Sequence, residues 1–172
     1  MKLLLRTLLY LTIVMWLGAE IFFPVIAAIA VSTLRLDTHA AETIAWASLH
    51  IVHIMGLVAG PLALILLALA QCLRIFKPRK VWAPMLFLAL MIALTGYSQF
   101  HLVPAMGRDR IAANGEEDSL DTANPSWIDF NRLHRQAEHV EVVILVLGLA
   151  TVALGTAAES ATGAGDRGAN PS

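Results

Sequence analysis

The sequence predicts an all-α protein built as a bundle of four membrane-spanning helices. Of its 172 residues, 58% are hydrophobic and 15% are charged, whereas soluble globular domains carry about 25% charged residues. Four apolar stretches are each long enough to cross the hydrocarbon core, which takes about 20 helical residues. Only helices and closed barrels satisfy their backbone hydrogen bonds in lipid, and these stretches have helical length. We therefore expect one transmembrane domain over residues 1–159 and a disordered, Gly/Ala/Ser-rich tail over residues 160–172.

The expected spans cover about residues 6–32, 41–73, 81–103 and 127–157. The first span begins like a signal sequence, but its apolar run continues to about residue 34 and is too long for one. Pro24 and Pro61 lie inside the first two spans and are expected to kink them. Ser126, three residues before Asp129, indicates the cap at the start of the last helix.

Basic residues between the spans predict the orientation. Four of them follow the second span closely, namely Arg74, Lys77, Arg79 and Lys80, and Lys2 and Arg6 stand on the same side. In the connection near residues 33–40 basic and acidic residues balance, and in the connection near residues 104–126 acidic residues outnumber basic ones. Because excess Lys and Arg stays in the cytoplasm, we expect both termini there and these two connections outside.

Charge and cysteine content exclude other classes of protein. The net charge of -1 gives no basic surface for nucleic acid. Cys72 is the only cysteine, so the chain has no intrachain disulfide and no cysteine metal cluster. The expected partner is the lipid bilayer, and a membrane-protein partner or a homo-oligomer is left open.

Seven ionisable side chains interrupt the apolar spans at similar depth. A helix rises about 1.5 Å per residue, which places all seven in the outer half of the bilayer. A charged or imidazole group inside lipid is costly, so each needs a partner or a function. These residues are therefore the candidate site: Glu20, His50, His53, His101, His134, Glu138 and Glu141.

The spacing of these residues predicts that they face one another. His50 and His53 share a helix face that continues into a strip of small residues at Gly56 and Gly60, which is typical of close helix packing in membranes. The last span carries its three residues at i, i+4 and i+7, within one narrow arc. In the third span, Tyr97, Ser98 and His101 are expected to form one strip.

Imidazole and carboxylate groups together favour a transition-metal site, with iron, copper, zinc or manganese as the candidates. All seven residues are the expected ligands of a mononuclear or dinuclear site, with redox chemistry or metal handling as the function. Di-iron bundles also draw Glu and His inward from four helices, although their Glu-x-x-His spacing is absent here. Neither a reaction nor a substrate is indicated.

Three other interpretations stay open. The polar groups could be a structural network in a non-catalytic scaffold or accessory subunit. They could instead hold haem b, with His53 or His50 facing His101 or His134 across the bundle. A proton or ion conduit is less favoured, because polar residues are nearly absent between Gly56 and Leu73.

Several short motifs resemble the transmembrane protein 205-like family. The segment from Phe130 to His134, followed by Glu141, is similar to the family's Phe-x-x-Leu-His segment, and Trp16-x-Gly18 is similar to part of its first helix. Leu102-Val103-Pro104 resembles the end of its third helix. The resemblance covers about residues 8–155 and implies a small four-helix protein, of a kind often found in bacteria and mostly of unknown function. It therefore implies a bacterial inner membrane location, whereas the His and Glu residues of the polar layer depart from the family pattern.

Overall fold

A computed structural model confirms the all-helical membrane fold. It describes residues 2–34, 38–73, 75, 78–112 and 124–167. Within these ranges there is no strand, and four helical segments are long and apolar enough to cross a membrane: Lys2–Thr33, Thr43–Cys72, Val81–Ala112 and Pro125–Thr156. The chain is therefore an integral membrane protein.

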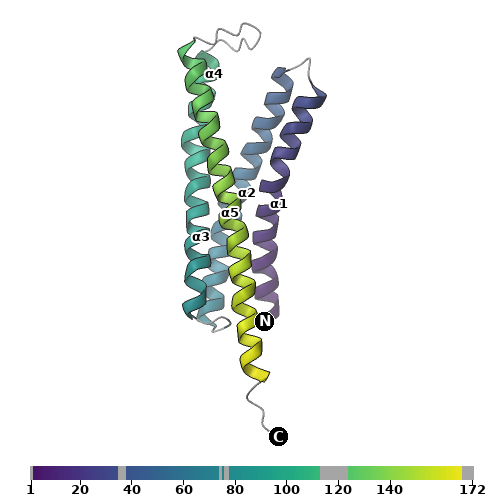
Figure 1. Ribbon diagram of the computed structural model, residues 1–172, viewed down its shortest axis with the longest axis vertical. Helices are drawn as coiled ribbons and strands as arrows, with labels where there is room; N and C mark the ends of the chain where they lie inside the picture. The colour runs from purple at the N-terminus through teal and green to yellow at the C-terminus, as the bar shows by residue number, and fades with distance from the viewer. Residues whose placement is uncertain (1, 35–37, 74, 76–77, 113–123, 168–172) are drawn as a thin grey trace.

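The helices are α1 (Lys2–Thr33), α2 (Thr38–Cys72), α3 (Pro78–Tyr97), the π-helical turn η1 (Ser98–Leu102), α4 (Val103–Ala112) and α5 (Pro125–Arg167). Figure 1 shows them running along one long axis, with the N- and C-termini at the same end. We call this the termini end, and we call the opposite end, where α1 is followed by α2, the connection end. Toward the connection end, α1 and α2 diverge from α4 and the start of α5 (Figure 1). The cytoplasmic location of the termini stays a prediction.

The third span is longer than expected and is not a uniform helix. α3, η1 and α4 continue one another, so the span reaches Ala112 instead of ending near residue 103. The turn η1 interrupts the regular helix at the level where the polar residues lie. Such π-turns are frequent at functional sites.

The start of the last helix differs from the prediction, whereas the end of its membrane span agrees with it. Asn124, rather than Ser126, caps its start, because the Asn124 side-chain oxygen accepts a hydrogen bond from the Ser126 backbone N–H at 3.0 Å. Pro125 then occupies the first helical position, where its missing N–H costs nothing. At the other end the membrane-spanning part of α5 ends at Thr156, in agreement with the expected span end near 157, and the helix itself continues to Arg167. Residues 168–172 lie outside the described ranges.

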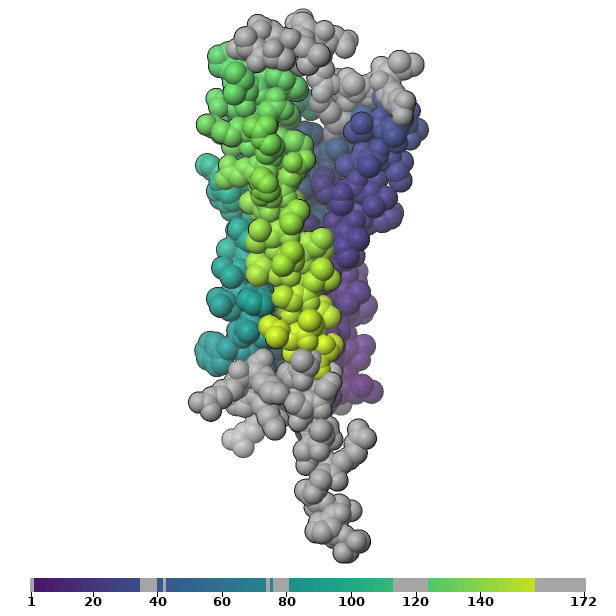
Figure 2. Space-filling model, in the orientation of Figure 1, coloured from purple at the N-terminus to yellow at the C-terminus, as the bar shows by residue number. Residues whose placement is uncertain are grey.

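The apolar core fills the bundle between the polar layer and the termini end. Its buried members come from α1, α2, α3 and α5 and include Leu9, Ile13, Leu67, Leu88 and Ile144. Many other large apolar side chains are exposed on the outer faces of the helices, as lipid contact requires. Figure 2 shows the resulting elongated, closely packed shape.

Glycines allow the helices to approach closely in this region, as the small-residue strip predicted. A Cβ added at Gly56 would lie 2.5 Å from Nε1 of Trp16, and one at Gly60 would lie 2.5 Å from Cγ1 of Ile92. On α5, a Cβ at Gly148 would overlap Leu17 of α1. Close backbone approach at small residues is the usual way in which membrane helices associate. The packing of α1 against α2 and α5 therefore fixes where the polar residues of α1 lie.

Candidate functional site

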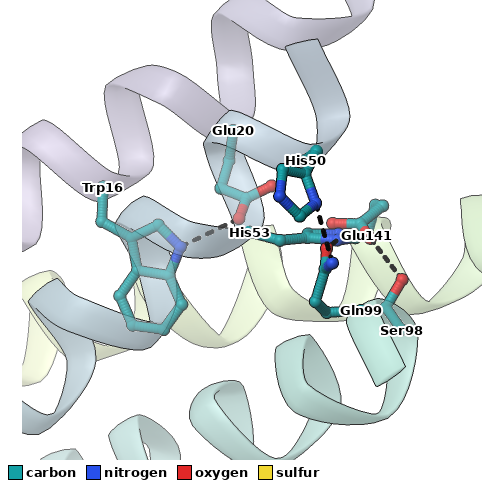
Figure 3. Close-up of polar contacts among 7 residues, drawn as sticks. All are labelled: Trp16, Glu20, His50, His53, Ser98, Gln99 and Glu141. Atoms are coloured by element: carbon teal, nitrogen blue, oxygen red, sulfur yellow. Dashed lines mark hydrogen bonds and ion pairs between the residues drawn. The ribbon is translucent and has the colours of Figure 1, made fainter. Parts of the chain in front are cut away.

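A cluster of polar side chains lies in the middle of the bundle, with members from α1, α2, η1 and α5 (Figure 3). We call it the polar cluster; it comprises Trp16, Glu20, His50, His53, Ser98, Gln99 and Glu141. The convergence of acidic and imidazole groups at one depth, predicted from the sequence, is thus present for four of the seven candidate residues: Glu20, His50, His53 and Glu141.

His53 is the centre of the polar cluster. Its side chain is completely buried, and both ring nitrogens are engaged. Nδ1 lies 2.9 Å from Oε1 of Gln99, and Nε2 lies 2.8 Å from Oε1 of Glu141. The imidazole therefore bridges η1 and α5 from its position on α2.

Glu141 reaches the imidazole from α5. Its Oε1 also accepts a hydrogen bond from Ser98 Oγ at 3.1 Å. Its other carboxyl oxygen, Oε2, is buried and has no hydrogen-bond partner among the described residues. A buried carboxyl oxygen without a donor is costly, so this atom is where a further proton or ligand would be stabilised.

Glu20 approaches the same point from α1. Its Oε1 accepts a hydrogen bond of 2.9 Å from Nε1 of Trp16, one helical turn earlier, and the Trp16 indole is completely buried. The Glu20 carboxyl is also near enough to Glu141, and less strongly to His53, to interact with them electrostatically. Figure 3 shows Glu20, His53 and Glu141 pointing toward one another. Two carboxyl groups from separate helices therefore lie near one buried imidazole, and the Glu141 carboxyl is hydrogen-bonded to it.

Gln99 joins His53 to the second histidine of α2. Its Nε2 lies 2.8 Å from Nδ1 of His50, while its Oε1 faces His53. Gln99 is buried, whereas His50 is exposed. The hydrogen-bonded chain thus runs from an exposed imidazole through a buried amide to the buried imidazole and its carboxylate.

The π-turn explains why Gln99 and Ser98 both face inward. Neighbouring residues of a regular α-helix point about 100° apart, because each turn takes 3.6 residues. In η1, Ser98 and Gln99 are both buried, while Phe100 is 71% exposed. Residue spacing does not predict this turn, and a neutral residue such as Gln99 does not stand out among the ionisable groups of the spans.

With the Gln99 amide in this orientation, donor and acceptor chemistry places a hydrogen on one imidazole nitrogen and excludes it from another. An amide oxygen only accepts, so His53 Nδ1 must carry a hydrogen and donate it to Gln99. The Gln99 amide nitrogen only donates, so His50 Nδ1 must accept and carries no hydrogen. A further proton lies between His53 Nε2 and Glu141 Oε1 and is bonded either to the imidazole nitrogen or to the carboxyl oxygen. In either placement the pair formed by His53 and Glu141 is neutral overall.

His101, His134 and Glu138 lie outside the polar cluster. His101 is exposed and stacks on Tyr97, with ring centroids 5.2 Å apart, because η1 turns it away from Ser98 and Gln99. His134 and Glu138 are 55% and 63% exposed and contact each other at 3.4 Å.

The direction of α5 explains why the i, i+4, i+7 pattern does not hold along its whole length. Near the connection end α5 packs against α4, where Phe130, Leu133 and Ala137 surround Leu102 and Met106. The face that carries His134 is therefore turned outward there. Only Glu141, nearer the middle of the helix, lies on the face directed at α1 and α2.

The arrangement of these groups gives no support to the predicted metal site. Among the described residues, no group of three or more His, Cys, Asp or Glu side chains is placed so that it could hold a metal ion. Both ring nitrogens of His53 already take part in hydrogen bonds, so coordination by His53 would require one of these bonds to break. The described side chains instead form a hydrogen-bonded network that links α2, η1 and α5.

Comparison with known proteins does not assign the polar cluster to a known family. No protein-family model, curated protein or solved structure matches the chain.

Proposed function

We propose that this membrane protein binds and releases a proton inside the bilayer, at the group formed by Glu20, His53 and Glu141, as the working site of a proton-coupled process. The observation that supports this proposal is the approach of two carboxyl groups, the buried Glu20 and the half-buried Glu141, to the buried imidazole of His53. Ionisable groups within membrane helices are rare and are characteristic of proton relays in pumps and transporters.

Counting charges shows which group would exchange the proton. The pair of His53 and Glu141 is neutral wherever its shared proton lies. The protonation state of Glu20 therefore determines the net charge of the three groups. They are neutral together when Glu20 is protonated and carry one negative charge when it is not. Two adjacent carboxylates cannot both stay ionised without a compensating charge. A net charge at this depth is also costly, so the cluster favours holding the proton until its surroundings change.

The unpaired oxygen of Glu141 supplies a place for that proton. Oε2 is buried without a donor, and the Glu20 carboxyl interacts with the same side chain. A proton between the two carboxyl groups would give Oε2 a hydrogen bond and remove the repulsion between them. The proton-bound form is thus the form in which every buried oxygen of the two groups has a partner.

The fluorescence of Trp16 tests the proposal directly. Its Nε1 donates to Glu20 and its ring is completely buried, so its emission reports the charge of that carboxyl. A variant with Trp46, Trp82 and Trp127 changed to Phe keeps Trp16 as the sole tryptophan. We expect its emission in detergent or bicelles to titrate with pH, and Glu20→Gln to abolish that titration. An emission that is independent of pH over the range in which the protein stays folded would contradict the proposal.

A metal centre is the second candidate, and it would require the side chains of Glu20, His53 and Glu141 to move, because as described they are not placed to hold an ion. The unpaired Glu141 oxygen and the neighbouring Glu20 carboxyl are anionic ligands that a cation would also satisfy. Elemental analysis of protein purified from metal-rich medium separates the two candidates. A stoichiometric metal that disappears in Glu141→Gln would favour the metal centre, whereas the proton site predicts a far smaller content that chelators do not change.

The proposal also includes the membrane in which the protein lies, its orientation there and its association with other proteins. The basic residues beside the termini end support a cytoplasmic location for both termini. The resemblance to the transmembrane protein 205-like family supports a bacterial inner membrane. Association with a second copy or with another membrane protein is compatible with the exposed apolar faces, which lipid also covers.

A further inference from the structure

The side-chain amide of Gln99 contacts one imidazole with each of its two polar atoms. Its Oε1 lies 2.9 Å from Nδ1 of the completely buried His53, and its Nε2 lies 2.8 Å from Nδ1 of His50 (Figure 3). Gln99 is buried in the π-turn η1, whereas both histidines belong to α2 and lie one helical turn apart. One amide therefore links two imidazoles of a neighbouring helix through the same type of ring nitrogen.

An amide cannot make the same kind of hydrogen bond at both of these atoms. Its oxygen only accepts, so the Nδ1 atom that faces it must carry a hydrogen. Its nitrogen only donates, so the other Nδ1 atom must be without one. Turning the amide by half a rotation would exchange the two imidazoles in these roles and would leave the rule unchanged. The Nδ1 atoms of His50 and His53 therefore differ in hydrogen content in either orientation of the Gln99 amide.

The orientation of the amide also decides what His53 presents to Glu141. With Oε1 of Gln99 facing His53, the hydrogen of the neutral ring is on Nδ1. Nε2 of His53 and Oε1 of Glu141, which are 2.8 Å apart, then need a further proton between them, because an imidazole lone pair would otherwise face a carboxylate oxygen. With the amide reversed, the neutral ring would instead donate its only hydrogen from Nε2 to an ionised Glu141. The first arrangement is neutral, whereas the second carries one negative charge.

The surroundings of Glu141 favour the neutral arrangement. The Glu20 carboxyl is near enough to interact with Glu141 electrostatically, so a fixed negative charge on the pair of His53 and Glu141 would oppose ionisation of Glu20. A net charge inside a membrane bundle is also costly in itself. The orientation of Gln99 that keeps a proton on this pair is thus the one that leaves Glu20 free to be the group that changes charge.

We infer that Gln99 is the positioning residue of the proton site. Its amide gives the Nδ1 atoms of His50 and His53 opposite hydrogen content. In the described orientation it thereby keeps one proton on the pair of His53 and Glu141, while Glu20 exchanges its own. This role rests on the proposed function. Gln99 itself neither binds nor transfers a proton, and it acts only through the tautomer of His53.

NMR of the imidazole nitrogens tests the inference in the unsubstituted protein. Isotope-labelled histidine is incorporated, the protein is reconstituted in lipid, and the ring signals are assigned from those that His50→Gln and His53→Gln each remove. A nitrogen that carries a hydrogen is recognised by its one-bond N–H coupling. We expect this coupling at Nδ1 of His53 and not at Nδ1 of His50, throughout the pH range in which Trp16 emission titrates. Any other pattern, such as hydrogens on both Nδ1 atoms or on neither, would overturn the inference.

A matched pair of glutamine variants tests the role of Gln99 itself. Gln99→Met keeps an unbranched side chain of similar length and removes both hydrogen bonds. His53 can then place its hydrogen on Nε2 and donate to an ionised Glu141, so the N–H coupling at Nδ1 should be lost at the alkaline end of the titration. Gln136→Met removes an exposed amide that donates to the Tyr97 hydroxyl outside the polar cluster, and it should keep the parent pattern.

The two readouts separate failure of this inference from failure of the proposed function. If Trp16 emission titrates but the His53 tautomer is the same in folded Gln99→Met as in the parent, the inference is overturned and the proton site stands. If Trp16 emission is independent of pH, the proposed function fails, and with it the role given to Gln99. Where Gln99→Met does not fold, the spectrum of the parent protein still decides, because the opposite hydrogen content of the two Nδ1 atoms needs no variant of Gln99.

Discussion

Replacing His53 with Ala removes the centre of the polar cluster and should strongly destabilise the fold. The imidazole is completely buried and contributes hydrogen bonds to Gln99 at 2.9 Å and to Glu141 at 2.8 Å. Side-chain hydrogen bonds in membrane proteins average about 0.6 kcal/mol and reach about 1.7 kcal/mol, so these two account for about 1–3 kcal/mol. Truncation also leaves a cavity, and the total expected loss is about 2–4 kcal/mol.

This loss is smaller than the usual cost of breaking a buried ion pair, which is about 3–5 kcal/mol in soluble proteins. The reason is that Glu141 can take up a proton once the imidazole is gone, and so avoids being left as a buried, unpaired charge. The combination of His53→Ala with Glu141→Gln should therefore cost less than the sum of the single changes. A coupling free energy of about 1–2 kcal/mol is expected for such contacting residues.

The assay measures reversible unfolding in bicelles, induced either by denaturant or by steric trapping. His139→Ala is the matched control, because this histidine is exposed on α5 and should change the unfolding free energy by less than about 0.5 kcal/mol. If His53→Ala were no more destabilising than His139→Ala, the buried hydrogen-bonded position of His53 would be wrong.

Three smaller changes test the packing and the limits of the polar cluster. Gly56→Ala should lower the unfolding free energy by about 1–3 kcal/mol, because its Cβ would lie 2.5 Å from Trp16 Nε1. Gly18→Ala, whose Cβ would have nothing within 4 Å, should be neutral or stabilising by up to about 1 kcal/mol. Equal effects of the two substitutions would contradict the close approach of α1 and α2. Ser98→Ala should cost about 1 kcal/mol by removing a donor to the buried carboxylate, and a neutral result would argue against that bond. Glu138→Gln should leave both stability and the pH titration of tryptophan emission unchanged, since its side chain is 63% exposed; a loss of titration would place it in the site.

The fold and part of the site could be predicted from the sequence because the signals were strong. Long apolar runs identify membrane helices with little ambiguity, since lipid offers the backbone no other partner. Glu20 and His53 could be recognised because ionisable groups in such runs need partners. The glycine strip at Gly56 and Gly60 correctly indicated a packing face.

The remaining features depend on irregularities that periodicity does not reveal. The π-turn shifts the facing of the third span, so Gln99 enters the polar cluster and His101 leaves it. The outer part of α5 packs against α4, which turns His134 and Glu138 outward. Neither the local helix geometry nor the change of packing partner can be inferred from residue spacing alone.

Infrared spectroscopy of the carboxyl groups tests the central claim most directly. A buried, protonated carboxyl has a C=O stretching band that ionised carboxylates lack, and the band is measured in reconstituted protein as pH is varied. We expect a pH-dependent band that both Glu20→Gln and Glu141→Gln alter or remove, and that Glu138→Gln leaves unchanged. A spectrum without such a band at any pH at which the protein is folded, or a band that survives both substitutions, would contradict a shared proton between Glu20 and Glu141.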